Sequence, residues 1–167
     1  MCSVLKKALE EKRFQDADNE TRSLLIRQAG PDAVKRGWVY FTEIRTIPVV
    51  DMATVDGLWK AYSNGKFGYS VQRELWLQNR KQWPRFFKAI NWLTSENQYL
   101  NWPGDFVYTM DAKKGHLPLV NALRGTNLFE EIFTHPAINK QKETKKIGGG
   151  NGASGGAGGG SDKPSWL

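Results

Sequence analysis

The stretch Tyr62-Ser-Asn-Gly-Lys-Phe-Gly-Tyr-Ser-Val-Gln72 decides the fold, because it joins the two clearest helical patterns of the chain. Ahead of it, an apolar stripe at helical spacing predicts a helix that ends at Asn64-Gly65. Behind it, Leu75 and Trp76 belong to a second stripe, with Ser70 as the expected N-cap. We therefore predict two consecutive helices joined by a short glycine-containing turn.

Helical periodicity extends to both sides of this stretch. Apolar stripes near residues 4–9 and 17–25 predict two helices, the second stopped by Gly30-Pro31, and Pro84 suits the first turn of another. The expected N-caps are Ser3, Asp51, Ser70 and Thr126. Residues 38–41 and 106–108 look like β-strands but are too short and too few for a sheet, so we predict an all-α, compact orthogonal helical fold.

The composition is that of one basic domain. The chain has 167 residues, of which 24 are Lys or Arg and 17 are Asp or Glu, giving a net charge of +7. Seven tryptophans and a hydrophobic content of 40% supply enough apolar surface for a core. The single cysteine, Cys2, excludes an intramolecular disulfide and a thiolate metal cluster. No run approaches the roughly 18 consecutive apolar residues of a membrane-spanning helix.

Two segments fall outside the helical pattern. Residues 94–125 contain several Pro and Gly breaks, and irregular loops beyond about 12–15 residues are usually functional or disordered. The aromatic content of this loop argues against disorder. Residues 148–160 are almost entirely Gly, Ala and Ser, which is typical of a flexible linker. We expect a folded domain over residues 1–136, with the long loop covering a ligand, and a basic, Gly-rich flexible tail over residues 137–167.

The sequence shows no arrangement typical of an enzyme or a metal site. It offers no nucleophile beside a base, and His116 and His135 are far apart; a single His in a turn is more often a structural hydrogen-bonding group. The basic, Trp-rich character leaves two partner classes open. A nucleic acid would pair with Lys and Arg and stack on aromatic rings. A flat anionic ligand would need an apolar cleft with a basic rim.

Four short motifs resemble one family. In chain order they are Ala17-Asp-Asn-Glu-Thr21, Val55-Asp-Gly-Leu-Trp59, the block from Tyr62 to Gln72, and Gly115-His-Leu-Pro118. In this order, and over about residues 4–136, they resemble the GUN4 family. The block from Tyr62 to Gln72 is the most specific of the four.

This resemblance implies a non-catalytic protein that binds protoporphyrin IX and Mg-protoporphyrin IX and stimulates magnesium chelatase through its H subunit. It also implies a place in chlorophyll biosynthesis and plastid signalling, and an all-helical core shaped like a cupped hand. We further expect a monomer, peripheral membrane association and no nucleic-acid partner, although a nucleic-acid-binding module is the alternative from the residues alone. A family that accepts metal-free and magnesium porphyrins cannot depend on an axial ligand, so His116 is not expected to bind metal.

The resemblance also implies a porphyrin site, carried over one residue at a time. The expected binding residues are Phe67, Val71, Trp102, Phe106, Tyr108, Leu117, Leu119, Asn121 and Arg124. Asn121 and Arg124 resemble polar rim positions that meet the propionates. The family pattern has a further arginine where this chain has Asn127, so Lys113 or Lys114 are the candidate replacements.

The C-terminal end resembles the extension of plant and algal members of the family. This likeness predicts a chloroplast location, with the transit peptide absent from this chain, and the N-terminal helical bundle of cyanobacterial members is expected to be absent too. We expect a regulatory tail, in which a phosphate on Ser161 or Ser165 adds about −1.5 to −2 charge near Trp166.

Overall fold

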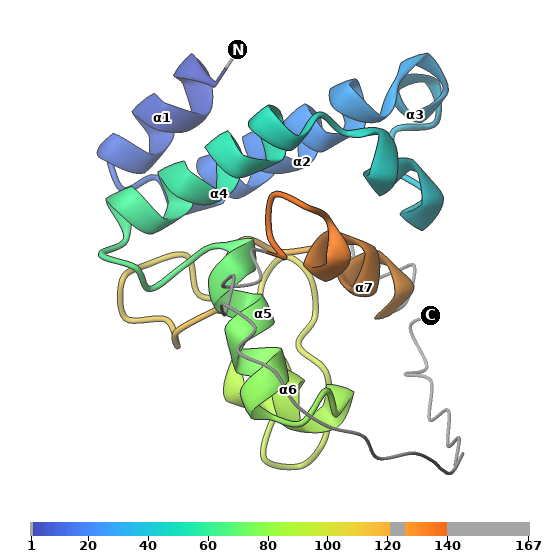
Figure 1. Ribbon diagram of the computed structural model, residues 1–167. Coiled ribbons are helices and arrows are strands. Elements are labelled where there is room, and N and C mark those ends of the chain that lie inside the picture. The colour runs from blue at the N-terminus through green and yellow to red at the C-terminus, as the bar shows by residue number, and fades with distance from the viewer. Residues whose placement is uncertain (1, 121–125, 140–167) are drawn as a thin grey trace, which may run out of the picture.

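The computed structural model describes residues 2–120 and 126–139, and these residues form a helical domain (Figure 1). In chain order the elements are α1 (Ser3–Glu10), α2 (Phe14–Ala29), α3 (Pro31–Arg36), the 3₁₀ helix η1 (Phe41–Thr46), α4 (Val49–Tyr62), α5 (Tyr69–Gln78), α6 (Trp83–Ala89) and α7 (Thr126–Thr134). Among the described residues there is no strand, and Leu93 and Tyr99 form an isolated antiparallel bridge. The predicted all-α fold is confirmed.

The first half of the chain builds one layer, in which α1, α2 and α4 lie together above the rest of the molecule (Figure 1). The indole Nε1 of Trp59 in α4 donates to Thr21 Oγ1 in α2 at 2.9 Å, and both side chains are buried. Phe14 and Phe67 pack edge to face at a centroid distance of 5.5 Å beside the Trp59 ring. This layer is therefore held by an aromatic cluster with a satisfied polar bond at its centre.

A second aromatic cluster joins the lower helices. Trp83 and Phe86 of α6 pack against Phe129 and Phe133 of α7 at centroid distances of 5.6 to 6.4 Å. Trp76 of α5 contacts the same group, 5.4 Å from Phe133. Phe86, Phe129 and Phe133 are almost fully buried, and truncating such a side chain typically costs about 3–5 kcal/mol. This cluster anchors α7 across α5 and α6.

The turn between α4 and α5 is built around a buried carboxylate. Asp56 accepts hydrogen bonds from the backbone N–H of Ser70 at 2.8 Å and from its hydroxyl at 2.7 Å, and it pairs with Lys60 at 3.2 Å. Gly68 has a φ of +135°, and a Cβ there would lie 2.9 Å from the Asp56 carboxylate. The block is therefore a close-packed corner that requires glycine at this position.

The expected N-caps are wrong in detail. α4 begins at Val49 after Pro48, and α5 begins at Tyr69, so Asp51 and Ser70 lie inside the first turns of their helices. Ser70 does not cap because its hydroxyl donates to Asp56 across the corner. Ser3 and Thr126 are likewise the first helical residues of α1 and α7. The predictions therefore placed these helices correctly, but the predicted start of each helix differs from the observed start by one to a few residues.

The long loop is packed against the helices over its described part. Gln72 of α5 donates its amide hydrogens to the carbonyl oxygens of Gly115 at 3.0 Å and Pro118 at 2.8 Å. Trp92 Nε1 donates to the carbonyl of His116 at 2.9 Å. At Gly115, with φ +79°, a Cβ would lie 2.5 Å from a methyl group of Leu75. These contacts fix the Gly-His-Leu-Pro turn against α5.

Two short helical elements are additional to those predicted. α2 stops at Gly30, as predicted, and the chain then forms α3 and η1, while residues 106–108 form no strand, in agreement with the predicted all-α fold. Packing also continues past the predicted domain end at Pro136, because Ala137 and Ile138 are buried in the core. The predicted tail beyond Asn139 lies outside the described residues.

Candidate functional site

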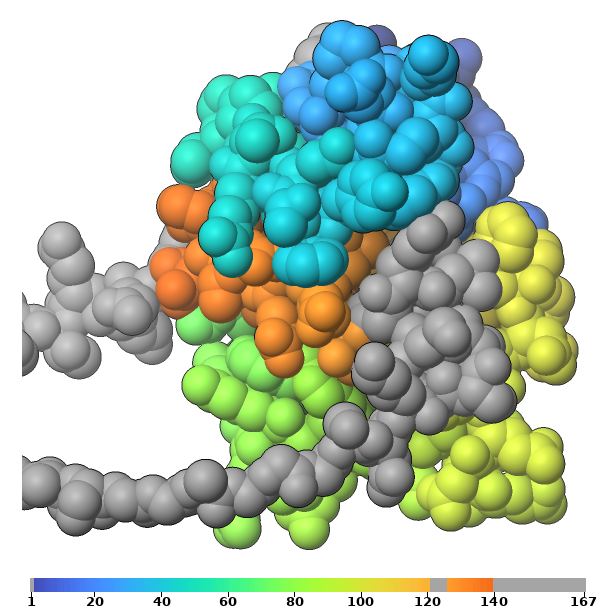
Figure 2. Space-filling model, turned by 90° about the vertical axis from the view of Figure 1, so that its right-hand side faces the viewer, coloured from blue at the N-terminus to red at the C-terminus, as the bar shows by residue number. Residues whose placement is uncertain are grey.

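An apolar depression lies where the N-terminal layer meets α7 and the end of the long loop. It is partly open to solvent, and its cavity volume is about 30 Å³. Figure 2 shows η1 (cyan) directly against α7 (orange). The lining residues are Arg22, Leu25, Ile26, Trp38, Val39, Ile44, Tyr69, Leu119, Val120, Leu128 and Ile132. Apart from Arg22 and the hydroxyl of Tyr69, these side chains offer aliphatic or aromatic surface.

Helical spacing explains how α2 and α7 build the two walls. Leu25 and Ile26 follow Arg22 by one turn in α2, and Leu128 and Ile132 are four residues apart in α7. Tyr69, at the start of α5, is buried among them, and this burial raises the pKa of its hydroxyl. Tyr69 is therefore neutral in the physiological range.

The segment before η1 supplies an aromatic edge. Trp38 and Tyr40 pack edge to face at 4.1 Å, and the Arg36 guanidinium lies over both rings, 5.0 Å and 4.3 Å from their centroids. Arg36 is held in place by Glu43 at 2.6 Å. Trp38 lines the depression, and Tyr40 is 46% exposed beside it in the chain. A cation is thus fixed next to one edge of the depression.

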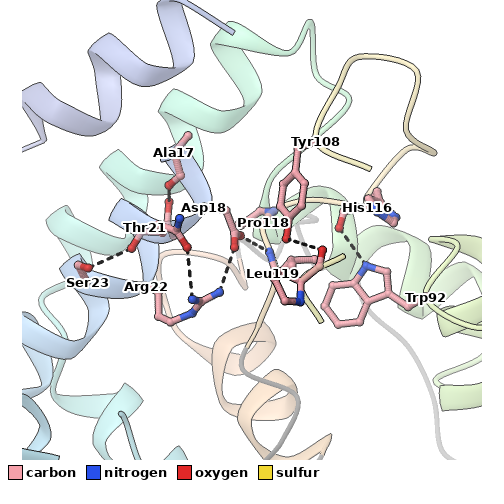
Figure 3. A network of polar contacts seen from close by, with 12 residues as sticks. Ala17, Asp18, Thr21, Arg22, Ser23, Trp92, Tyr108, His116, Pro118 and Leu119 are labelled. Atoms are coloured by element: carbon pink, nitrogen blue, oxygen red, sulfur yellow. Dashed lines mark hydrogen bonds and ion pairs between the residues drawn. The ribbon is translucent and has the colours of Figure 1, made fainter. Parts of the chain in front are cut away.

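A buried carboxylate supports the opposite edge (Figure 3). Asp18 accepts a hydrogen bond from the backbone N–H of Leu119 at 2.6 Å, and its other oxygen pairs with Arg22 at 3.1 Å. Burial is the main influence on this group and raises the pKa of Asp18 to about 7, against the opposing effects of the Leu119 N–H and the Arg22 charge. Both partners of Asp18 line the depression.

Arg22 connects this carboxylate to the long loop. Its guanidinium carbon lies 5.0 Å from the centroid of the Trp102 ring, and Trp102 is 56% exposed. Among the described side chains that line the depression, Arg22 is the one that carries a charge. An anionic group of a ligand would therefore meet a guanidinium between an indole face and a carboxylate.

His116 has no free nitrogen in this conformation. Its Nδ1 lies 2.7 Å from the carbonyl of Ile90, and its Nε2 accepts the backbone N–H of Val107 at 3.0 Å. The ring is therefore neutral with the proton on Nδ1, in keeping with burial, which lowers the pKa of His116.

Nowhere in residues 2–120 and 126–139 do three or more His, Cys, Asp or Glu side chains gather at metal-binding distance. None of the described helices is long and apolar enough to span a bilayer.

His135 is structural as well. It is buried just after α7, and its Nε2 lies 3.0 Å from the carbonyl of Ile47. Its Nδ1 accepts the backbone N–H of Ala137 at 3.2 Å. These contacts tie the end of α7 to the residue after η1.

Three of the expected porphyrin-binding residues lie in the interior. Phe67 and Leu117 are fully buried and Val71 is nearly so, and none of them lines the depression. Phe67 belongs to the cluster around Trp59 because the Ser63 hydroxyl accepts its backbone N–H and holds the turn inward. In this structure Phe67 and Leu117 are enclosed in the core, Val71 is 6% exposed, and their part in binding a porphyrin stays a prediction.

The other expected residues divide between the loop and the depression. Phe106 packs against Trp92 and His116, each at 5.6 Å, and the Tyr108 hydroxyl donates to Pro103 at 3.4 Å. Burial raises the pKa of Tyr108 to about 12. Leu119 lines the depression. Asn121, Arg124, Ser161 and Ser165 lie outside the described residues.

Most of the residues that form the depression carry no clear signal in the sequence. Asp18 and Arg22 carried a signal, because an acid and a base four residues apart flank the apolar face of α2. Trp38 and Val39 lie in a short β-like stretch that gives no indication of a site. Tyr69 carried none, because a tyrosine next to a helix start looks the same whether it faces solvent or the core.

Comparisons with known proteins agree on one family. The GUN4-like family model matches residues 2–136. The chain is 43% identical over 132 residues to the "Ycf53-like protein" of Synechocystis sp., covering 79% of this chain and 56% of that protein. It is 43% identical over 143 residues to the "Tetrapyrrole-binding protein, chloroplastic" of Arabidopsis thaliana, covering 81% of this chain and 54% of that protein. The chain thus spans about half the length of these curated relatives.

Solved structures give the same result at the level of the fold. A structure of GUN4 from Chlamydomonas reinhardtii is 56% identical with a TM-score of 0.76, covering 83% of this chain and 89% of that one. The ligand-free structure of Arabidopsis thaliana GUN4 is 43% identical with a TM-score of 0.76, covering 83% of this chain and 97% of that one. Sequence and fold agree over the whole region that forms the depression, and the chain belongs to the GUN4 family.

Proposed function

We propose that this protein binds a tetrapyrrole in the apolar depression. The observation that carries the proposal is the combination of an aliphatic and aromatic lining with the Arg22 guanidinium at its edge. The cavity volume of about 30 Å³ is far below the roughly 300–1,000 Å³ of small-molecule sites, so the ligand would lie over this surface rather than fill a closed pocket. The Arabidopsis relative is named a tetrapyrrole-binding protein, which supports the same ligand class.

The chemistry of protoporphyrin IX and its magnesium form suits these residues. The macrocycle is flat and apolar, so burying its face against Leu25, Ile26 and Leu128 is favourable by about 25 cal/mol per Å². Its two propionates are anionic and need cations at the rim. Arg22 lies in the lining and Arg36 beside Trp38, so charge-assisted hydrogen bonds are available next to the apolar surface.

Residues of the long loop would cover the ligand and line part of its site. Trp102 lies over Arg22 and is exposed, so it can cover a ligand that reaches the guanidinium. Leu119 and Val120 form the described end of the loop in the depression. Asn121 and Arg124 follow Val120 directly in the chain and are kept as proposed rim residues.

The protein's role with the tetrapyrrole is binding rather than catalysis. We propose that the loaded protein delivers protoporphyrin IX to magnesium chelatase, or holds the magnesium product, through contact with the H subunit, as a chloroplast protein of chlorophyll biosynthesis. The Arabidopsis relative is named as a chloroplastic protein, which supports that location. In a chelatase assay, adding the protein should raise the rate, and a variant that cannot bind porphyrin should not.

The direct test is a quenching titration of intrinsic tryptophan fluorescence with deuteroporphyrin and its magnesium form. Trp38 in the lining and Trp102 above Arg22 are reporters within or beside the site. Ile26→Asp places a carboxylate in the apolar wall and should weaken binding at least about tenfold. Val50→Asp makes the same change at a position that is 69% exposed and outside the lining, and should leave binding unchanged.

Three other results would count against the proposal. Absence of saturable quenching in the wild type would refute tetrapyrrole binding by this chain. Equal weakening by Ile26→Asp and Val50→Asp would keep the ligand but refute the depression as its site. An affinity for single-stranded nucleic acid that exceeds the porphyrin affinity and falls steeply with log[salt] would favour the nucleic-acid alternative.

A further inference from the structure

Asp18 is a buried acid whose two carboxylate oxygens contact different partners. Oδ1 accepts the backbone N–H of Leu119 from the loop, and Oδ2 faces the guanidinium of Arg22 on its own helix (Figure 3). The side chain of Asp18 is 1% exposed and that of Arg22 is 24% exposed. A group from solvent can therefore reach Arg22 but not Asp18.

The electrostatic surroundings of Asp18 contain a single compensating charge among the described residues. Arg22 supplies it from α2, and Tyr69 of α5 and Tyr108 of the loop face the same carboxylate with hydroxyls whose pKa values are raised, so both are neutral. Asp56 of α4 also acts on Tyr69, but its carboxylate is engaged by Ser70 and Lys60. The charge state of Asp18 is thus controlled by burial and by how closely Arg22 is paired with it.

We propose that Asp18 is a positioning residue that couples the binding of an anionic tetrapyrrole at Arg22 to the uptake of one proton by the Asp18 carboxyl. Ionised Asp18 holds Arg22 by charge and cancels its field in the depression. When a propionate of the ligand pairs with Arg22, Asp18 loses part of that compensation and gains a neighbouring negative charge. Protonation removes the conflict and leaves the guanidinium to the ligand.

The direction of the effect follows from linkage. Because Asp18 has a pKa of about 7 in the ligand-free protein, it changes charge where the ligand's propionates, with ordinary values of about 4–5, stay ionised. If binding raises the pKa of Asp18, then a fall in pH through this range must tighten binding by the same coupling. The Leu119 contact survives protonation, because the carbonyl oxygen of a neutral carboxyl still accepts an N–H.

This inference rests on the proposed tetrapyrrole function and is tested by its pH dependence. The affinity for deuteroporphyrin is measured by tryptophan quenching from about pH 6 to about pH 8.5, for the wild type, Asp18→Asn and Asp16→Asn. We expect wild-type affinity to rise roughly fivefold or more toward low pH, with a flat profile for Asp18→Asn. Asp16→Asn makes the same change on an exposed position of α2 and should keep the wild-type profile.

Two further measurements separate this mechanism from other causes. Deuteroporphyrin dimethyl ester has no carboxylate for Arg22, so its affinity should show no pH dependence that Asp18→Asn removes. A ¹³C NMR titration of the Asp18 carboxyl carbon should show a midpoint that moves upward when deuteroporphyrin is bound, and this readout needs no variant.

The outcomes are distinct. Saturable binding with a flat wild-type profile, or with a slope that Asp18→Asn retains, overturns the coupling and leaves the proposed function intact. An unchanged carboxyl midpoint on binding overturns it as well. Absence of binding at every pH overturns both the proposed function and this inference.

Discussion

The carboxylate of Asp56 accepts both the backbone N–H and the hydroxyl of Ser70, at 2.8 Å and 2.7 Å, across the corner between α4 and α5. This contact gives a structural reason for several residues of the motifs that identified the family. Asp56, Gly68 and Ser70 pack together at this corner, which we call the Asp56 clasp, and the indole of Trp59 donates a hydrogen bond to Thr21 of α2. Apart from Tyr69, which lines the depression, the motif residues therefore build the scaffold on which the depression depends.

Replacing Asp56 with alanine should destabilise the fold. The change leaves the Ser70 hydroxyl and backbone N–H without their acceptor in a buried corner, so we expect a loss of about 2–4 kcal/mol in the free energy of unfolding. Urea unfolding followed by circular dichroism measures the difference. Asp111→Ala, at an exposed loop position, is the matched control and should change stability by less than about 0.5 kcal/mol. Equal effects of the two substitutions would contradict the clasp.

Gly115→Ala should be more harmful than Gly104→Ala in the same loop. At Gly115 the new methyl group would lie 2.5 Å from Leu75 Cδ1 with the backbone at φ +79°, whereas at Gly104 there is no atom within 4 Å. We expect a loss of about 2 kcal/mol or more for Gly115→Ala and a change within about 1 kcal/mol for Gly104→Ala. Thermal unfolding of both variants provides the comparison, and similar midpoints would show that the loop turn is not packed against α5 as described.

The stability of the wild type should fall relative to Asp18→Asn as the pH rises. The pKa of Asp18 is about 7 in the folded protein and about 4 in an unfolded chain, so the folded form binds more protons between these values. The contribution of this group is therefore fully favourable below about pH 4 and is lost as the pH rises through 7.

We compare the free energy of unfolding of the wild type with that of Asp18→Asn. Between about pH 4.5 and pH 8 the difference between the two should change by about 2–4 kcal/mol. Urea unfolding at several pH values measures it, with Asp16→Asn as the exposed control on the same helix. Parallel stability curves for the wild type and Asp18→Asn would refute a raised pKa at this position.

His116→Gln should lower stability without changing the preference between porphyrins. His116 links Ile90 to Val107 through both ring nitrogens, and glutamine cannot reproduce that pair of contacts in the same geometry. We expect a loss of about 1–3 kcal/mol in the free energy of unfolding. The ratio of affinities for magnesium and metal-free deuteroporphyrin, measured by fluorescence quenching, should stay at the wild-type value. A selective loss of affinity for the magnesium form would instead indicate that His116 binds the metal.

The helices could be predicted from the sequence because their signals are local. Apolar spacing, Gly30-Pro31 and Pro84 act within one or two turns of the chain, so the positions of α2, α4, α5 and α6 are confirmed. The same reasoning missed α3 and η1, since their few residues carry no periodic stripe and their form depends on packing against α2 and α7.

The candidate site could be predicted only in part. Leu119 was expected to contact a ligand and does line the depression, while Phe67, an equally apolar residue of the most specific motif, packs in the core. A family motif marks residues under constraint but does not separate those that hold the fold from those that touch a ligand.

By itself the sequence determined the helical class, the family and the glycine-containing turn that follows Tyr62, since periodicity, motif order and turn chemistry are properties of neighbouring residues. Only the tertiary structure decided that Asp18 meets Leu119, a residue far along the chain, and that both His116 nitrogens are occupied. The reason is physical: burial and hydrogen-bond partners arise when distant segments pack together. They set whether a carboxylate is ionised, whether an imidazole is free and which apolar faces enclose the depression.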